Sequence, residues 1–409
     1  MTSPTVPNAD LDYWRAELLG SLGGVDQMTQ AVIHQMEAAD LSVAGDMAAV
    51  LAAFQSGSRW YPPKTANGAA PQPARSSAGP RLSTTKLRHD AEQFRYLRAV
   101  GRLGAEFDEI IRDYLDIADR MAPLGDDARL PLSAEDEARI GHVYGRIAHI
   151  ADEPRVDQAL SATWDREAVQ RKYLDIPPGI VIVDDFLSPA ALDGLRRFCL
   201  ESTVWSGNRY AHGRLGCLFL AGFNCPLLMQ VAEEIRDSFP RLIGPERPWR
   251  QLWGFKSSSR LPADSTLHAD FAAVNVNFWI TSEEANLDRS SGGLVIYDVA
   301  APLWWDFKSY NARPELIRGY LRERRARAIT IPYRANRAII FNSDLFHATA
   351  EVRFRPEYEN RRINITMLFG DRAEDNHHLF PGRAEAVERA HTAHPAWRSR
   401  AFSQPRARR

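Results

Sequence analysis

The stretch Ala338-Ile339-Ile340-Phe341-Asn342-Ser343-Asp344-Leu345-Phe346-His347 reads as an apolar strand, a polar turn and the start of a second strand. Its apolar, partly β-branched beginning is typical of a β-strand, and Asn, Ser and Asp favour the turn that follows. The turn carries His347 onto the second strand. This part of the chain is therefore predicted to be β-structure with a polar side chain at a defined position.

Strands of this kind dominate the sequence from Trp249 onward, with Gly, Pro, Asn or Asp between them. The predicted strands are 251–257, 266–270, 273–280, 293–298, 328–332, 337–342, 347–352 and 362–369. Many short strands separated by turn residues favour a closed or double-sheet architecture of the jelly-roll kind. One long insertion, 301–327, interrupts the pattern and is expected to be a functional loop, since long loops in compact folds commonly are.

The first 170 residues have a different, helical character. Apolar residues recur at helical spacing in 1–60 and again in 84–170, whereas 61–83 is rich in Pro, Ala, Ser and Gly and reads as a linker or loop. A strand at 180–183 and a helix from Pro189, capped by Ser188, open the region 175–375 that holds the β core. Residues 376–409 are expected to form a C-terminal tail. The predicted fold class is α+β, with an all-α region before the β core.

Composition places the chain among ordinary globular proteins. It has 409 residues, 44% hydrophobic and 25% charged, with a net charge of −1. The near-neutral charge argues against a nucleic-acid or membrane-surface binder. No apolar run approaches the roughly 20 residues that span a bilayer, and the N-terminus lacks the pattern of a signal peptide. Three cysteines without a CxxC spacing fit a reducing environment, so we expect a cytoplasmic protein.

His268 and Asp270, in Leu267-His268-Ala269-Asp270, are the first candidate metal ligands. On a strand, side chains two positions apart share a face, so these two can grip one ion. His347 on another predicted strand is the third candidate. Two imidazoles and one carboxylate cap one face of an octahedral Fe(II) and leave the opposite positions open. An HxD pair alone is a weak signal, and His347 strengthens it because a barrel interior can receive all three side chains.

Arg362 completes the candidate site. It begins the run Arg362-Ile363-Asn364-Ile365-Thr366, in which alternation places Arg362, Asn364 and Thr366 on one polar face. A buried arginine presents a rigid fork of donors that suits a carboxylate. The competing interpretation is a surface arginine on an edge strand, and the neighbouring Arg361, which points the other way, is the natural candidate for that role.

These residues, in this order, resemble the HxD…H…R pattern of the 2-oxoglutarate- and Fe(II)-dependent dioxygenases. The resemblance covers roughly 177–375. The run from Arg362 to Thr366 is similar to the RxNxT variant of some branches, including those that repair alkylated nucleic acid. The resemblance implies a double-stranded β-helix fold for the β core.

The resemblance also implies a reaction. His268, Asp270 and His347 would bind Fe(II), and Arg362 would hold the distal carboxylate of 2-oxoglutarate, helped by Asn364 or Thr366. Together with O2 this chemistry oxidises an unactivated C–H bond, usually by hydroxylation, and releases succinate and CO2. Halogenating relatives replace the carboxylate ligand by a small residue. Because Asp270 is present, hydroxylation, desaturation or oxidative cyclisation is the better interpretation.

Other residues are weaker candidates. Trp253 and Lys256, on the strand before the HxD pair, and Asn277, on the strand after it, are candidates for contact with the co-substrate, although core or hydrogen-bonding duty is the competing explanation. The remaining candidates are for substrate contact, where a solvated or anchoring role competes: Arg260, Tyr297, Trp304 and Trp305.

The expected substrate is a small molecule, an amino-acid derivative or a peptide. Three other functions stay open: a nucleic-acid demethylase with a basic, aromatic-lined groove, a non-catalytic β-barrel interaction module, and a zinc hydrolase, in which Arg362 has no evident task. The helical region could form a homodimer, cover the barrel mouth, or recognise a carrier or protein substrate.

Overall fold

The computed structural model describes residues 81–372 apart from 209, 220–221, 264–265 and 371. The predicted N-terminal helices in 1–60, all but the end of the predicted linker in 61–83, and the predicted tail in 376–409 lie outside the described residues. The predicted homodimer contact through the N-terminal helices therefore also lies outside the described residues.

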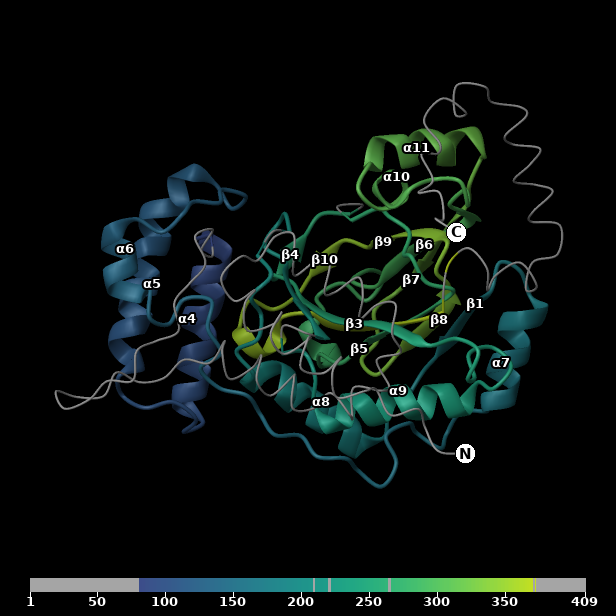
Figure 1. The fold of residues 1–409 in the computed structure, drawn as a ribbon, viewed down its shortest axis with the longest axis horizontal. Coiled ribbons are helices and arrows are strands. Elements are labelled where there is room, and N and C mark those ends of the chain that lie inside the picture. Colours follow the sequence, from purple (N-terminus) through teal and green to yellow (C-terminus); the bar gives the residue numbers. More distant parts are fainter. Residues whose placement is uncertain (1–80, 209, 220–221, 264–265, 371, 373–409) are drawn as a thin grey trace, which may run out of the picture.

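A six-stranded antiparallel sheet forms the centre of the described structure (Figure 1). Its order is β1-β8-β5-β11-β3-β2, and every neighbouring pair is antiparallel. The strands are β1 (Ile180–Val183), β2 (Leu215–Leu218), β3 (Trp249–Lys256), β5 (Val274–Trp279), β8 (Ala338–Asn342) and β11 (Ile363–Phe369). β5 and β11 are buried along their whole length. Their residues are accordingly either apolar or polar with a hydrogen-bonding side chain.

A smaller antiparallel sheet packs against one face of the large one. Its order is β7-β6-β9, with β6 (Leu294–Ala300), β7 (Ala328–Ile331) and β9 (Leu345–Thr349). One hydrophobic cluster joins the sheets, because it contains Trp279 and Phe341 from the large sheet and Ile296 and Leu345 from the small one. Two short strands, β4 (Arg260–Leu261) and β10 (Val352–Arg353), pair beside them.

Helices cover the other face of the large sheet. They are α7 (Arg166–Asp175), α8 (Pro189–Glu201) and α9 (Pro226–Ser238), and α8 and α9 lie along the sheet in Figure 1. Phe198 and Leu228 from the helices share a core with Val276 and Ile365 from the strands. The predicted strand at 180–183 and the helix at 189–201 are confirmed, and the Ser188 hydroxyl accepts a hydrogen bond from the Ala191 N–H as the predicted cap.

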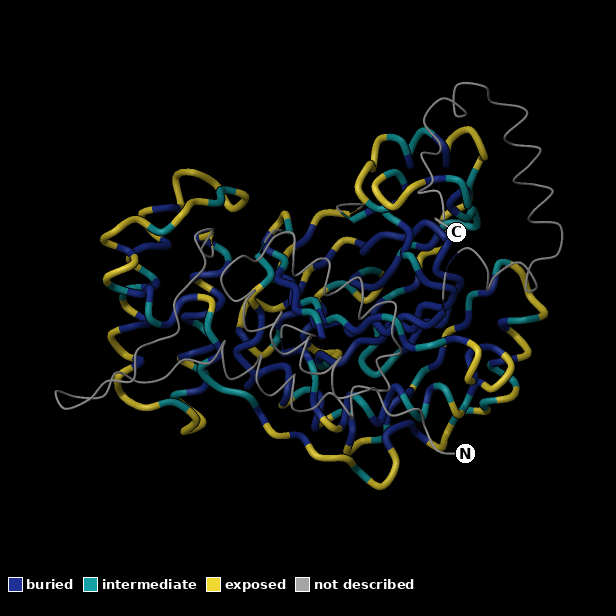
Figure 2. The backbone as a smooth tube through the Cα atoms, in the orientation of Figure 1, coloured by how far each residue is buried: buried dark blue, intermediate teal, exposed yellow. Residues whose placement is uncertain are grey.

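The first described helices form a bundle beside the β core. They are α4 (Thr84–Ala99), α5 (Phe107–Met121), the 3-10 turn η2 (Ala122–Leu124) and α6 (Ala134–Ile140). Phe94, Phe107 and Tyr114 pack edge to face in a core of their own. Figure 2 shows the buried faces of these helices turned inward and their outer faces exposed. Gln93 fastens the bundle to the β core by donating to the Leu200 and Ser202 carbonyls at 2.9 and 3.0 Å.

The insertion contains α10 (Phe307–Asn311) and α11 (Pro314–Glu323), which lie over the small sheet in Figure 1. Short 3-10 turns, η4 (Glu283–Ala285) and η5 (Tyr358–Asn360), complete the described elements. Among the described residues, no helix combines the length and apolar character needed to cross a bilayer.

The predicted strand at 266–270 is wrong. Only one isolated bridge, His268 to His347, occurs there. The backbone N–H groups of Ala269 and Asp270 donate instead to the Tyr310 and Ser343 carbonyls, at 2.9 and 3.1 Å. A backbone N–H group that is bonded to the insertion or to a turn cannot also pair with a neighbouring strand. The regular strand-to-strand hydrogen bonds are therefore missing at these two residues. The predicted strand at 347–352 also shifts: β9 begins at Leu345 and ends at Thr349.

Candidate metal centre

His268, Asp270 and His347 come together at the edge of β9. One ligand atom from each lies within 4.8 Å of the others. His268 Nε2 is 3.5 Å from Asp270 Oδ1, and His347 Nε2 is 3.4 Å from Asp270 Oδ2. Paired backbone bonds hold the two histidines side by side, since the N–H of each donates to the carbonyl of the other at 3.0 and 2.8 Å. Asp270 and His347 are buried, whereas the His268 side chain is 25% exposed, so the group opens towards solvent beside His268.

The other nitrogen of each imidazole faces a backbone carbonyl. His347 Nδ1 lies 2.9 Å from the Leu345 oxygen, and His268 Nδ1 makes the same kind of bond to the Thr266 oxygen. A carbonyl oxygen only accepts, so Nδ1 carries the proton in both rings. Each Nε2 therefore presents a lone pair towards Asp270, the arrangement in which a histidine binds a metal ion.

Asp270 has its own partner on the large sheet. Asn275 Nδ2, on β5, donates to Asp270 Oδ2 at 2.7 Å. Burial alone would raise the pKa of the Asp270 carboxyl, but the His268 and His347 imidazoles outweigh that effect and the net shift lowers the pKa. The group thus offers two imidazole nitrogens and one carboxylate oxygen. This donor set suits a divalent iron with open positions.

A buried ion pair steadies the turn between β8 and β9. Arg372 Nε lies 2.6 Å from Asp344 Oδ1, and Arg372 Nη2 donates to the Ala301 and Pro302 carbonyls at 2.8 Å each. The guanidinium also stacks 4.3 Å from the Tyr310 ring centroid. Sequence reasoning missed Arg372 and the role of Asp344. Their only signal is a carboxylate in an otherwise apolar stretch and an arginine just after the last strand.

Arg362 lies buried at the start of β11 and has no carboxylate partner among the described residues. Its Nε donates to the Gly292 carbonyl at 2.5 Å, Nη1 to Asn364 Oδ1 at 3.0 Å and Nη2 to the Gly293 carbonyl at 3.3 Å. A guanidinium has five N–H donors, so one N–H on each Nη is left over. Burial lowers the pKa of Arg362 to about 10, which keeps it charged at neutral pH. Two adjacent donors on a charged fork suit one carboxylate.

The strand register places the other polar candidates on the same face. Thr366 pairs with Trp253 on one side and Asn277 on the other, and Asn277 Nδ2 donates to Thr366 Oγ1 at 2.8 Å. Alternation puts Asn275, the partner of Asp270, on this face as well. The metal-ligand group and Arg362 therefore face the same side of the large sheet. Asn277 Oδ1 is buried without a hydrogen-bond partner among the described residues, which leaves an acceptor facing this interior.

The predicted contact of Lys256 with the co-substrate is not supported by its position. It lies on the opposite face of β3, where Nζ donates to the Cys199 carbonyl and to the Tyr358 hydroxyl, each at 2.8 Å. Because successive side chains of a strand point to opposite faces, Trp253 and Lys256 cannot both face the metal ligands. Burial lowers the pKa of Lys256 well below its ordinary value. Its contacts belong to the interface between the sheet and the helices, so the suggested co-substrate contact is wrong.

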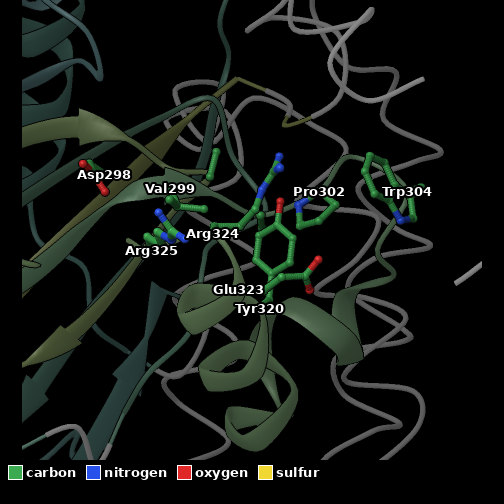
Figure 3. Close-up of a pocket in the computed structure, with 10 residues that line it drawn as sticks. Asp298, Val299, Pro302, Trp304, Tyr320, Glu323, Arg324 and Arg325 are labelled. Atoms are coloured by element: carbon green, nitrogen blue, oxygen red, sulfur yellow. The ribbon is translucent and has the colours of Figure 1, made fainter. Parts of the chain in front are cut away.

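Three of the four substrate candidates, Tyr297, Trp304 and Trp305, belong to one hydrophobic cluster that also contains Leu267 and Ala269, the neighbours of His268. Arg260 is exposed on β4, and Tyr297 is half-buried on β6. Trp305 packs on Tyr320 and Phe346 and anchors the insertion. Trp304 lines a cavity of about 530 Å³ between the end of β6 and α11, shown in Figure 3. None of the metal-ligand group lines this cavity, and Arg260 is not part of the cluster that holds the other three candidates.

No protein-family model matches the chain, and no curated protein matches it either. Similar solved structures exist at low identity. The non-heme alpha-ketoglutarate-dependent carbocyclase SnoK from nogalamycin biosynthesis is 11% identical, with 55% of this chain and 93% of that one covered and a TM-score of 0.35. HygX from Streptomyces hygroscopicus, solved with nickel, 2-oxoglutarate and hygromycin B, is 9% identical over 47% and 83%, with a TM-score of 0.34. A Pseudomonas putida prolyl-4-hydroxylase is 14% identical over 50% and 98%, with a TM-score of 0.31.

Proposed function

We propose that the chain is a 2-oxoglutarate- and Fe(II)-dependent dioxygenase with a double-stranded β-helix core. The convergence of two imidazole Nε2 atoms and one carboxylate carries the proposal, together with a buried arginine on the same side of the large sheet that has no counter-ion among the described residues. The strand order supports the fold. The large sheet contains the adjacent strands β8, β5, β11 and β3. The small sheet contains β7, β6 and β9 in that order, and the isolated bridge from His268 to His347 extends it beyond β9.

The chain's own residues would divide the work. His268, Asp270 and His347 would hold Fe(II), and Asn275 would keep the carboxylate turned towards it. Arg362 would bind the distal carboxylate of 2-oxoglutarate through its two remaining donors, oriented by Asn364. Bound iron, with 2-oxoglutarate and O2, supplies the oxidation of a C–H bond together with release of succinate and CO2. Trp253, on the same face, would help to exclude water from the reacting centre.

Contacts within the sheet account for the polar residues in the run Arg362-Ile363-Asn364-Ile365-Thr366, without a nucleic-acid substrate. Asn364 accepts from Arg362, and Thr366 accepts from Asn277, so both polar side chains already serve the interior of the sheet. This favours a small molecule, an amino-acid derivative or a peptide as substrate, with hydroxylation as the expected outcome. The three cysteines are buried and form no disulfide within the described residues, which fits a cytoplasmic setting. Homodimer formation through the N-terminal helices remains a prediction.

The decisive experiment is an anaerobic titration of Fe(II) and 2-oxoglutarate into the full chain. We expect metal-dependent binding of 2-oxoglutarate, loss of metal binding in His268→Ala, and an affinity for 2-oxoglutarate at least about tenfold lower in Arg362→Gln, since a lost charged hydrogen bond costs about 1.5–3 kcal/mol. Arg361→Gln is the matched control. Arg361 is ion-paired with Glu92 at 2.8 Å, on the other side of the strand.

Two results would contradict the proposed function. One is binding of 2-oxoglutarate that does not depend on the metal or on Arg362. The other is tight tetrahedral zinc binding with no affinity for 2-oxoglutarate, which would favour a hydrolase. If the expected binding is found, succinate formation in air by the wild type, and its absence in His268→Ala, would show turnover as well.

A further inference from the structure

Arg214 is a second arginine on the inner face of the large sheet, and sequence reasoning missed it. It directly precedes β2, in which Gly216 pairs with Phe255 and Leu218 with Trp253. Alternation places Arg214, Gly216 and Leu218 on one face, the same face that carries Trp253 and Phe255. In turn Phe255 pairs with Asn364, the partner of Arg362. The strand register therefore places Arg214 and Arg362 on one surface, with β3 between them.

Two aromatic rings hold the Arg214 guanidinium. Its central carbon is 4.5 Å from the Phe255 ring centroid and 5.0 Å from that of Tyr210, and the two rings meet edge to face at 4.9 Å. Stacking on aromatic faces leaves the N–H donors at the edge of the guanidinium plane free to point elsewhere. Gly216 makes this arrangement possible, because a Cβ there would lie 2.6 Å from Tyr210 Cε2 and 2.9 Å from Phe255 Cε1.

Arg214 has no counter-ion and no hydrogen-bond acceptor among the described residues, and its Nε is buried. Burial lowers the pKa of Arg214 to about 10, and the side chain stays charged at neutral pH. Arg214 is also close enough to Arg362 to add to the lowering of that residue's pKa, after the larger effect of burial. Two like charges on one face of the sheet, with no carboxylate bound to either of them among the described residues, are costly unless an anion joins them.

The loop that carries Tyr210 is held from outside by the helical bundle. Arg129 donates from Nη2 to the Tyr210 carbonyl at 3.0 Å and from Nε to the Asn208 carbonyl at 2.5 Å. The His212 N–H donates to Asp127 Oδ1 at 3.1 Å. Bonds from a separate element keep Tyr210 in place before any ligand arrives. The aromatic support of Arg214 is therefore preorganised, which is the condition for selective binding.

We propose that Arg214 binds a carboxylate of the primary substrate, and hence that the enzyme oxidises an organic acid. This rests on the proposed function, which assigns the distal carboxylate of 2-oxoglutarate to Arg362. The two remaining donors of Arg362 satisfy that one carboxylate. The donors of Arg214 then require a second anionic group, and Phe255 with Tyr210 offers an apolar wall beside it.

The test uses the full chain loaded with Ni(II) and 2-oxoglutarate, which form a complex without turnover. Calorimetric titration would compare three carboxylic acids, acetic, hexanoic and phenylacetic acid, with their primary amides. The variants are Arg214→Gln, Arg214→Lys, and Arg361→Gln as the control that removes an equal charge. We expect the wild type and Arg361→Gln to bind at least one acid about tenfold more tightly than its amide, a difference of about 1.4 kcal/mol.

Arg214→Gln should abolish the preference for the acid while its affinity for 2-oxoglutarate stays within about twofold of wild type, and Arg214→Lys should keep part of the preference. Either of two results overturns the proposal: no acid preferred by the wild type, or a preference that survives in Arg214→Gln. A third result, loss of 2-oxoglutarate affinity in Arg214→Gln as large as in Arg362→Gln, would assign Arg214 to the co-substrate instead. Failure of the wild type to bind 2-oxoglutarate with metal would contradict the proposed function itself.

Discussion

Asn275 sets the rotation of the Asp270 carboxylate. Its Nδ2 donates to Oδ2, while the backbone N–H of Asp270 donates to the Ser343 carbonyl, so both ends of the aspartate are held from different segments. Partners of this kind orient a metal ligand without touching the ion. Asn277, two residues along the same face, donates to Thr366 instead.

Replacing Asn275 by Ala should weaken metal binding although all three ligands remain. We expect a loss of about 10–100-fold in affinity for Ni(II) or Fe(II), the range found when an orienting partner is removed. Equilibrium titration of the metal alone measures this effect. Asn277→Ala is the control and should bind metal as the wild type does. Equal metal affinity in Asn275→Ala and wild type would show that the hydrogen bond plays no part in the site.

At the scale of elements, α4 docks on the β core through a buried polar cluster. His89 Nδ1 lies 2.9 Å from Asp90 Oδ1, Asp90 is ion-paired with Lys86, and the His89 ring meets Tyr358 edge to face at 5.8 Å. Burial lowers the pKa of His89 well below 6.5, and the nearby cations Lys256, Arg361 and Lys86 lower it further. His89 Nε2 has no acceptor among the described residues, which also favours the neutral ring.

This cluster predicts loss of stability in mild acid. Below the ordinary value of 6.5 the unfolded chain protonates His89 and the folded chain does not, so stability present above that pH falls as the pH drops. The expected contribution is on the order of 1 kcal/mol between about pH 7.5 and about pH 5.5. Urea unfolding of wild type and His89→Asn at both pH values measures it, since Asn keeps a donor to Asp90. A pH dependence that is identical in the two proteins would contradict the assignment.

At the scale of the whole molecule, the metal centre joins parts of the chain that share no local structure. His268 and Asp270 come from the segment that pairs with β9, His347 comes from β9 itself, and Asn275 and Arg362 come from the large sheet. The insertion contributes as well, because Ala269 N–H donates to the Tyr310 carbonyl and Asn311 donates to the Ala269 carbonyl at 3.0 Å. Folding of the entire β core is therefore required before the ligands meet.

Metal binding should then stabilise the whole core. At a free Ni(II) concentration of about 100 times its dissociation constant, the free energy of unfolding should rise by about 2.7 kcal/mol, because the unfolded chain lacks the assembled site. Urea unfolding with Ni(II) and with chelator gives the difference. It should vanish in His268→Ala and persist in Arg362→Gln, whose change affects the co-substrate only. Equal stabilisation of His268→Ala would place the ion elsewhere.

Much of this arrangement follows from local patterns in the sequence. Apolar runs bounded by turn residues predict seven of the eight strands close to their observed places, and Ser188 marks a helix start through its side-chain cap. The strand at 266–270 fails because its backbone bonds go to the insertion and a turn. Such partners are distant in sequence, and no local pattern records them.

The sequence by itself determined the residue types: the HxD pair, the later histidine, and an arginine at an alternating strand position. Only the tertiary structure decided which side chains meet. Lys256 and Trp253 lie on the same strand, yet the pleat places their side chains on opposite faces. Arg214 shares the face of Arg362 because of the register between strands. Side-chain alternation is a local property of one strand, but the register and the packing of two sheets depend on contacts across the whole chain.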